Sequence, residues 1–290
     1  MFCSYIMGFM EIVQDNKSLL KACKLIKKQK IIYIDTEFLR DKTYWPLLCL
    51  IQVKTARKTF GIDMIALRQT DFTEFKEILI NKKILKIIHA GRQDLEVIFL
   101  KLAIIINPIF DTQIAYNFLM NEGNIGYTTL VKKLLNKSLN KDFQVSDWSQ
   151  RPLSKKQINY ACNDVKYLPS IYKILSKEIK NKKRVREINK EFEKFEFVKN
   201  IYDINYAWKK IKFKKKSNIN LTLLKKFSKW RELEAQQLNL PRNWVITDKI
   251  IIKAAKKEIK KGEKSKKNKN KRLNSYLNKF LDYLESEKFI

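Results

Sequence analysis

The sequence predicts an α/β fold: a mixed sheet flanked by helices, followed by a smaller, all-helical C-terminal region. Two observations predict it. In the first 180 residues, short apolar runs of strand length alternate with longer segments whose apolar residues recur at helical spacing. Beyond that point only the helical spacing continues. Three strand-like runs, a helix, a further strand and further helices favour a mixed sheet with helices on its faces.

The strands are expected where apolar runs are short, near residues 31–35, 48–53, 58–62 and 84–88. Helices are expected where the apolar spacing follows the helical period, near residues 16–28, 72–81, 92–102, 111–120, 127–135 and 154–178. These elements account for the α/β part of the chain.

The C-terminal part is expected to be helical throughout. Leu221 to Ala235 and Leu273 to Leu284 have helical spacing, and residues 181–215 are interpreted as a charged helical linker. Residues 256–272 hold ten basic and two acidic side chains and are either a solvated loop or a phosphate-binding one. We therefore divide the chain into residues 1–180, 181–215 and 216–290.

The net charge is +31, from 61 basic and 30 acidic residues, and suits a polyanionic partner such as nucleic acid. Residues 181–290 hold 32 basic and 13 acidic side chains, so attraction to phosphate is expected mainly there. Binding should then weaken with added salt.

The cysteines and the opening residues bear on location. Cys3, Cys23, Cys49 and Cys162 form no Cys-x-x-Cys pair, and we interpret them as reduced core residues of a cytoplasmic protein. The apolar opening lacks the basic start of a signal peptide, and no run of membrane-spanning length follows. No membrane partner is expected.

The most informative motif is Asp35-Thr36-Glu37, at the end of the apolar run 31–34. Successive side chains on a strand alternate faces, so Asp35 and Glu37 point the same way. Paired carboxylates raise each other's pKa unless a cation lies between them, and hard oxygen ligands suit Mg²⁺ or Mn²⁺. Taken alone, Asp35 would more often be a turn or cap residue.

Two further carboxylates fall on predicted helices. Asp94 lies on a first helical turn, where the positive end of the helix favours an anion. Tyr160 and Asp164 are four residues apart, so both emerge from one helix face, and a phenol there can hydrogen-bond an attacking water. Separately, Asp94 is better explained as a helix N-terminal charge and Tyr160 as a half-buried aromatic residue. Together with Asp35 and Glu37 they predict a catalytic metal site.

Asp35-Thr36-Glu37, Asp94 and Tyr160-x-x-x-Asp164 resemble the three exonuclease motifs of the DEDD superfamily, in its tyrosine-bearing branch. Residues 38–52, 89–96, 110–113 and 147–153 are similar to the surrounding stretches of ribonuclease D, and residues 221–248 resemble the first half of an HRDC domain. Lys141 to Gln144 depart from the ribonuclease D pattern. The histidine-bearing branch has its base five residues before the last aspartate, where this chain has Asn159, so His89 is interpreted as structural.

The resemblance implies a ribonuclease H-like mixed sheet and an HRDC-like helical nucleic-acid-binding domain. The implied activity is a 3′-5′ exoribonuclease that releases 5′-nucleoside monophosphates from precursor tRNA and other small structured RNAs. The implied cofactors are two divalent ions, Mg²⁺ or Mn²⁺, held by Asp35, Glu37, Asp94 and Asp164, with Tyr160 orienting the attacking water. The oligomeric state stays open, with a monomer as the working expectation.

Several alternatives remain open. Trp148 and Arg151 precede the third motif and are candidate substrate contacts, although Trp148 could equally cover the active cleft. A DNA-directed 3′-5′ exonuclease would use the same metal site, but the HRDC-like tail favours RNA. A non-catalytic RNA-binding protein on a nuclease scaffold would have no need to keep four carboxylates and Tyr160. Trp230 and Trp244 could stack on bases, but aromatic residues at helical spacing more often lie in a core.

Overall fold

The computed structural model describes residues 10–139, 146–193, 203–213, 218–259 and 271–287. The chain divides into two compact units. The first comprises the described parts of Met1–Leu39 and Leu47–Val198, and the second those of Arg40–Pro46 and Lys199–Ile290. The finer division into a nuclease domain, a linker and an HRDC-like domain stays a prediction.

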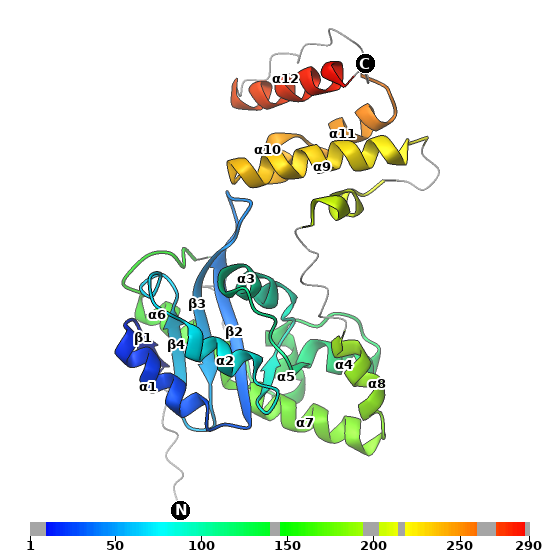
Figure 1. The fold of residues 1–290 in the computed structure, drawn as a ribbon. Helices are drawn as coiled ribbons and strands as arrows, with labels where there is room; N and C mark the ends of the chain where they lie inside the picture. Colours follow the sequence, from blue (N-terminus) through cyan, green and yellow to red (C-terminus); the bar gives the residue numbers. More distant parts are fainter. Residues whose placement is uncertain (1–9, 140–145, 194–202, 214–217, 260–270, 288–290) are drawn as a thin grey trace, which may run out of the picture. The chain divides into compact units, whose positions relative to one another are not determined.

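The first unit is built on a six-stranded mixed sheet with the strand order β1-β4-β3-β2-β5-β6 (Figure 1). The strands are β1 (Met10–Val13), β2 (Ile31–Leu39), β3 (Leu47–Lys54), β4 (Thr59–Asp63), β5 (Leu85–Ile88) and β6 (Ile109–Asp111). Strand β3 pairs with β2 and β4 in antiparallel orientation. The pairs β1–β4, β2–β5 and β5–β6 are parallel. The four predicted strands are confirmed as β2 to β5. The short edge strands β1 and β6 have too few residues to show a period.

Eight helices accompany this sheet in the described residues. They are α1 (Asn16–Ile26), α2 (Thr73–Ile80), α3 (Arg92–Leu102), α4 (Thr112–Met120), α5 (Tyr127–Leu135), α6 (Lys155–Lys166), α7 (Leu168–Asn181) and α8 (Val185–Glu193). Figure 1 shows α1 and α2 in front of the strands. Helix α6 contacts β1 to β4, and α3 contacts β2 and β3.

The single helix predicted over residues 154–178 is wrong, because the chain breaks at Tyr167 between α6 and α7. Pro169 has no amide hydrogen to continue the helical hydrogen bonds. The amide of Tyr167 donates instead to the hydroxyl of Tyr127, 3.2 Å away. A side chain from another helix therefore contributes to the break, which residue spacing alone could not reveal.

A buried lysine ties together the segments that precede β5 and β6. Lys86 is 0% exposed, and its ammonium donates to the carbonyl oxygens of Asn81 (3.0 Å), Ile84 (2.8 Å) and Asn107 (2.7 Å). These three bonds satisfy all three donors of the ammonium. Lys86 therefore stabilises the end of the sheet opposite to the turn that precedes α3.

The second unit contains the 3₁₀ helix η2 (Ile204–Lys210) and α9 (Leu221–Leu238), α10 (Arg242–Val245), α11 (Asp248–Ala255) and α12 (Lys271–Ser286). The helices predicted at 221–235 and 273–284 are confirmed as α9 and α12. Phe227 and Phe280 are both 0% exposed, and Trp230 packs against Phe280, so these rings form a core. Residues 260–270 of the Lys-rich stretch, and the departing loop 141–144, lie outside the described residues.

The loop Arg40–Pro46 belongs to the second unit. Within that unit the hydroxyl of Tyr44 donates to the buried carboxylate of Glu232, which also accepts from Arg242. Trp45 donates its backbone amide hydrogen to the Asn239 side chain at 3.0 Å.

Among the described residues, every helix is too short or too polar to span a membrane.

Candidate active site

Strand β2 carries the first two predicted site residues on one face. Asp35 pairs with Gln52 of β3, and Glu37 pairs with Leu50. The β2–β3 register shifts between Glu37 and Phe38, which is a bulge, and bulges turn side chains away from their regular direction. Because side chains alternate, Thr36 points to the opposite face.

Helix α6 supplies the next two residues. A capping box starts it: the amide of Gln157 donates to the Ser154 hydroxyl at 3.2 Å, and the Gln157 side chain accepts from the Ser154 amide at 3.0 Å. One turn apart on this helix, Tyr160 and Asp164 interact: after burial, the charge of Asp164 raises the pKa of Tyr160, and the Tyr160 hydroxyl opposes the rise in the pKa of Asp164. The structure thus brings together the two residues of the third predicted motif.

The carboxylates of Asp35, Glu37 and Asp164 converge, although 129 positions separate the first from the last in the sequence. One oxygen from each lies within 4.8 Å of the other two. The strand pair and the helix residue therefore form one cluster, as the sequence predicted.

Asp94 approaches from α3 and lies outside that tight group of three. Its carboxylate accepts a short hydrogen bond from the hydroxyl of Thr36. Its charge nevertheless raises the pKa of Asp35 and of Glu37, so it faces the same space. Thr36 therefore ties the fourth carboxylate to strand β2.

A buried aspartate organises the turn that places Asp94. Asp111 is 1% exposed and accepts from the amides of Ala90 (3.1 Å) and Gly91 (2.8 Å), and it also caps α4. A Cβ at Gly91 would lie 2.0 Å from Cδ1 of Ile88, so any larger residue would force the Ile88 side chain to shift. Sequence reasoning missed Asp111, because nothing in its spacing reveals that it bonds amides twenty residues earlier.

Electrostatics show that the cluster lacks compensation for its charge. Burial, followed by the charges of Asp94, Asp164 and Glu37, raises the pKa of Asp35 well above its ordinary value. Burial and then the neighbouring carboxylates raise the pKa of Glu37 to about 9. Burial is also the largest cause that raises the pKa of Asp164 to about 7 and that of Asp94 to about 6.

Such a cluster fits a divalent cation. The ligands are all hard carboxylate oxygens, and they lie within 4.8 Å of one another, near the separation of about 4.2 Å or less that two oxygens have when one Mg²⁺ binds both at about 2.1 Å. A bound cation would relieve the repulsion that raises these pKa values. The acidic cluster and the fold around it thus support divalent metal binding.

Gln52 is a site residue that sequence reasoning did not single out. Its side chain is 0% exposed, and its amide nitrogen lies 3.5 Å from Oε1 of Glu37. Its Oε1 is buried and has no hydrogen-bond partner among the described residues. The available signal was a polar residue inside the apolar run of β3, which precedes its terminal lysine. Gln52 therefore faces Glu37 from the neighbouring strand, as the cross-strand partner of Asp35.

Trp148 is a core residue, contrary to the stacking role considered from the sequence. It is 1% exposed and packs in a cluster with Leu50 and Ala161. Its ring centroid lies 6.0 Å from that of Tyr160. A base has no access to a ring buried to this degree, so the sequence-based stacking interpretation is corrected.

Arg151 is not available for phosphate, which corrects its assignment as a substrate contact. Its Nε and Nη2 donate to the two oxygens of buried Asp63 at 2.6 and 2.7 Å. Nη1 donates to the carbonyl oxygens of Trp148 and Gln150, and Nη2 also to that of Cys49. A guanidinium has five N–H donors, and these five bonds use them all. Arg151 therefore anchors the loop before α6.

His89 has the structural surroundings that the sequence analysis expected. Its Nδ1 lies 2.9 Å from the Thr112 hydroxyl and its Nε2 lies 3.1 Å from the carbonyl oxygen of Ile125. Burial lowers its pKa to about 4. The neutral imidazole can donate through Nε2 and accept through Nδ1, so both nitrogens are satisfied.

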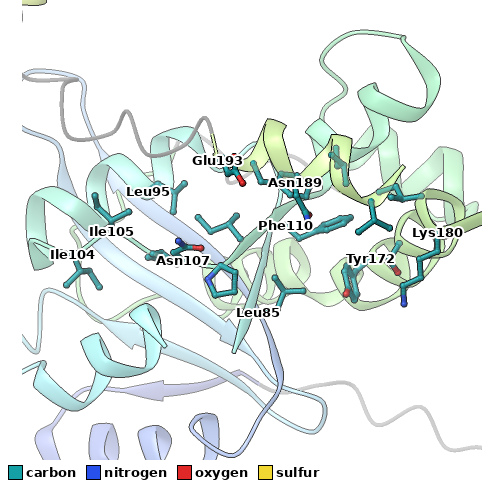
Figure 2. A pocket seen from close by; sticks show the side chains of 18 residues that line it. Leu85, Leu95, Ile104, Ile105, Asn107, Phe110, Tyr172, Lys180, Asn189 and Glu193 are labelled. Atoms are coloured by element: carbon teal, nitrogen blue, oxygen red, sulfur yellow. The ribbon is translucent and has the colours of Figure 1, made fainter. Parts of the chain in front are cut away.

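A separate cavity of about 390 Å³ lies among β5, β6, α7 and α8. Figure 2 shows Phe110, Tyr172, Asn189 and Glu193 around it, and most of its other lining side chains are aliphatic. None of the predicted site residues lines it. The cavity is therefore distinct from the acidic cluster.

Comparisons with known proteins agree with this geometry. Residues 10–180 match a family model described as 3′-5′ exonuclease. Ribonuclease D of Bartonella henselae is 38% identical over 248 residues, covering 85% of this chain and 61% of that protein. Ribonuclease D of Zymomonas mobilis is 36% identical over 242 residues, covering 83% of this chain and 62% of that protein. The chain thus spans about three fifths of the length of these curated relatives.

A solved structure shares the fold. Escherichia coli RNase D, described as an exoribonuclease involved in structured RNA processing, superposes with a TM-score of 0.83 at 26% identity, covering 96% of this chain and 74% of that chain. These likenesses confirm the predicted resemblance to ribonuclease D and the ribonuclease H-like fold. The matched residues 10–180 include the acidic cluster and Tyr160, and the chain belongs to the 3′-5′ exonuclease family.

Proposed function

We propose that this chain is a metal-dependent 3′-5′ exoribonuclease of the ribonuclease D type. One observation carries the proposal: the carboxylates of Asp35, Glu37 and Asp164 converge within 4.8 Å, and the Tyr160 hydroxyl, one helical turn before Asp164, affects the pKa of that carboxylate. The similarity to ribonuclease D from two organisms supports RNA as the substrate class. The description of the E. coli structure, an exoribonuclease involved in structured RNA processing, supports structured RNA as the substrate class, within which we propose precursor tRNA and other small RNAs.

The cofactors in this proposal are two divalent ions, Mg²⁺ or Mn²⁺. Bound at the cluster, they would neutralise the charge of a phosphodiester and make water a better nucleophile. Asp35, Glu37 and Asp164 would hold them directly, whereas Asp94 would contribute mainly through water, because Mg²⁺ keeps part of its hydration shell. The donor set, made only of carboxylate oxygens, supports these assignments.

Tyr160 would act as a positioning group for the attacking water. A phenol has an ordinary pKa near 10, so its hydroxyl stays protonated at neutral pH. Its hydroxyl interacts with Asp164, and a water held by the same carboxylate would lie within its reach. Attack of that water on the last phosphodiester would release a 5′-nucleoside monophosphate and leave a new 3′ hydroxyl.

The test uses purified protein and a 5′-labelled RNA with a short single-stranded 3′ tail. We expect stepwise shortening from the 3′ end, with nucleoside 5′-monophosphates identified by mass spectrometry, and inhibition by EDTA. Asp35→Asn and Asp164→Asn should abolish turnover, and Tyr160→Phe should lower it about 100-fold. Asp71→Asn is the matched control, because Asp71 is an exposed aspartate near α2. Near-normal turnover by Asp35→Asn would refute the proposal.

The same assay separates the alternatives. RNA and DNA strands of equal sequence, compared at equal concentration, distinguish an exoribonuclease from a DNA-directed exonuclease. Binding of RNA without nucleotide release at any metal concentration would indicate a non-catalytic RNA-binding protein. We expect faster release from RNA.

We also propose that residues 216–290 form an HRDC-like nucleic-acid-binding domain. The excess of basic residues in the C-terminal part supports this, and so does Trp244, which is 46% exposed. Trp244→Ala in the full chain should weaken RNA binding, measured by fluorescence anisotropy, while Trp230→Phe should not. Equal affinities of the Trp244→Ala variant and the wild type would contradict the role of Trp244.

Finally, we propose a cytoplasmic monomer. The cluster residues all come from one chain, and Cys23 and Cys49 are buried thiols outside any disulfide, as expected in a reducing compartment. Light scattering after gel filtration would measure the mass, and cell fractionation the location. A larger mass or a membrane-bound fraction would correct the proposal.

A further inference from the structure

The junction between α6 and α7 contains an inserted hydroxyl group. In a continuous helix the amide of Tyr167 would donate to the carbonyl oxygen of Asn163, four residues earlier. Here the Tyr167 amide donates to the hydroxyl of Tyr127 (3.2 Å), and that hydroxyl donates to the Asn163 carbonyl (3.1 Å). The phenol of Tyr127 therefore lies where one helical hydrogen bond would have been.

Pro169 alone does not explain this geometry. A proline removes the bond between its own nitrogen and the carbonyl four residues before it, which here belongs to Val165. The Tyr127 insertion acts on the bond between Asn163 and Tyr167, two positions earlier. Insertion of a side chain into the helical hydrogen-bond pattern is a recognised cause of sharp bends. Tyr127 thus determines where α6 ends.

Tyr127 is itself firmly placed. It is the first residue of α5 and packs against the core that contains Val165 and Leu168. Its ring centroid lies 5.5 Å from that of His89, whose two nitrogens are both hydrogen-bonded. The phenol is therefore held in place by α5 and the core, and its hydroxyl bonds the end of α6 from that fixed position.

The affected turn of α6 carries Asp164, which follows Asn163 directly. The Asp164 carboxylate must lie close to Asp35 and Glu37 for the cluster to form. The charges of Asp164 and Asp35 also contribute to the raised pKa of Tyr127, after burial, so the phenol lies near the cluster. A change in this last turn would move a metal ligand.

We propose that Tyr127 is a positioning residue for Asp164, because its hydroxyl bridges Asn163 and Tyr167 and so fixes the last turn of α6. The inference rests on the proposed metal site. Tyr127 itself does not act on substrate, because its proton is donated to Asn163 and its oxygen accepts from Tyr167. It acts only through the carboxylate that it places.

The test is Tyr127→Phe, which removes one oxygen atom and keeps the ring. Mn²⁺ affinity, measured by calorimetry on the full chain, should fall about 10-fold or more, as for other residues that support metal ligands. Tyr172→Phe is the matched control: Tyr172 packs on Phe110 in the same unit and is not part of the cluster. It should bind Mn²⁺ like the wild type.

A double-mutant comparison shows whether the effect passes through Asp164. In an Asp164→Asn background, Tyr127→Phe should cause no further loss of Mn²⁺ affinity. An equal loss in both backgrounds would overturn the inference, and so would unchanged affinity in the single variant. If Asp164→Asn binds Mn²⁺ like the wild type, there is no ligand to position and the inference also fails.

Two further measurements keep the outcomes separate. Thermal unfolding reports whether Tyr127→Phe is folded, and Lys86→Met, distant from the cluster, serves as a destabilised comparator that should keep its Mn²⁺ affinity. If Lys86→Met, at a similar loss of stability, loses as much Mn²⁺ affinity as Tyr127→Phe, the positioning role is refuted. RNA turnover tests the proposed function independently, because Mn²⁺ affinity is measured without RNA.

Discussion

Replacing Arg151 by methionine tests whether this arginine holds a loop or contacts RNA. The change removes two ionic hydrogen bonds to Asp63, of 2.6 and 2.7 Å, and three bonds to carbonyl oxygens. The Asp63 side chain is 0% exposed, so its charge would lose its compensating cation. Breaking a buried ion pair on one side typically costs about 3–5 kcal/mol.

We expect the lower end of that range, about 3 kcal/mol. Asp63 would keep three donors: the amides of Ile65 (3.1 Å) and Ala66 (3.0 Å) and the side chain of Gln14 (3.2 Å). The Arg151 side chain is also 19% exposed, so water can partly replace it. For a unit of this size, about 3 kcal/mol corresponds to a melting temperature lower by about 6–12 °C.

Urea unfolding followed by circular dichroism measures the loss, and fluorescence anisotropy measures RNA affinity under folding conditions. Arg68→Met is the control, since Arg68 is exposed, and should change neither quantity. In the double variant Asp63→Asn/Arg151→Met, the loss should be smaller than the sum of the single losses, because the two residues interact. Unchanged stability together with weaker RNA binding would refute the anchoring role and restore the substrate role.

Three further predictions concern buried groups of the first unit. Burial lowers the pKa of His89 to about 4, so between pH 6.5 and 4 only the unfolded chain gains the proton. Acidification over this range should lower the free energy of unfolding of the wild type by about 3 kcal/mol relative to that of His89→Asn. A difference between the two proteins that does not change with pH in urea titrations would contradict this. Lys86→Met should cost about 2 kcal/mol in urea unfolding, because three carbonyls lose their donor; an unchanged midpoint would show that water replaces the ammonium. Added Mn²⁺ should raise the melting temperature of the wild type, and EDTA should remove this increase. An equal increase in Asp164→Asn would argue against the acidic cluster as the Mn²⁺ site.

Local patterns in the sequence predicted much of the fold. The strands β2 to β5 and the helices α9 and α12 were predicted because their apolar residues repeat at the period of the element that forms. The third motif was predicted for the same reason, since Tyr160 and Asp164 lie one helical turn apart. Such features depend only on neighbours in the sequence.

The misjudged features depend on partners far away in the chain. Arg151 looked available for phosphate because Asp63, 88 positions earlier, gives no signal in the spacing. The sequence left Trp148 open between stacking on substrate and covering the cleft, because its burial beside Tyr160 arises only when α6 packs on the sheet. The break at Tyr167 depends on a hydroxyl from α5.

The sequence by itself determined the chemistry that the chain carries: four carboxylates and a phenol, arranged on a strand end and two helices. Only the tertiary structure decided which side chains face the cluster and which support it. Thr36, Gln52 and Tyr127 acquire their roles from contacts across the sheet or between helices. The physical reason is that period and residue type specify which way a side chain points along its own element, whereas hydrogen-bond partners are set by how the elements pack.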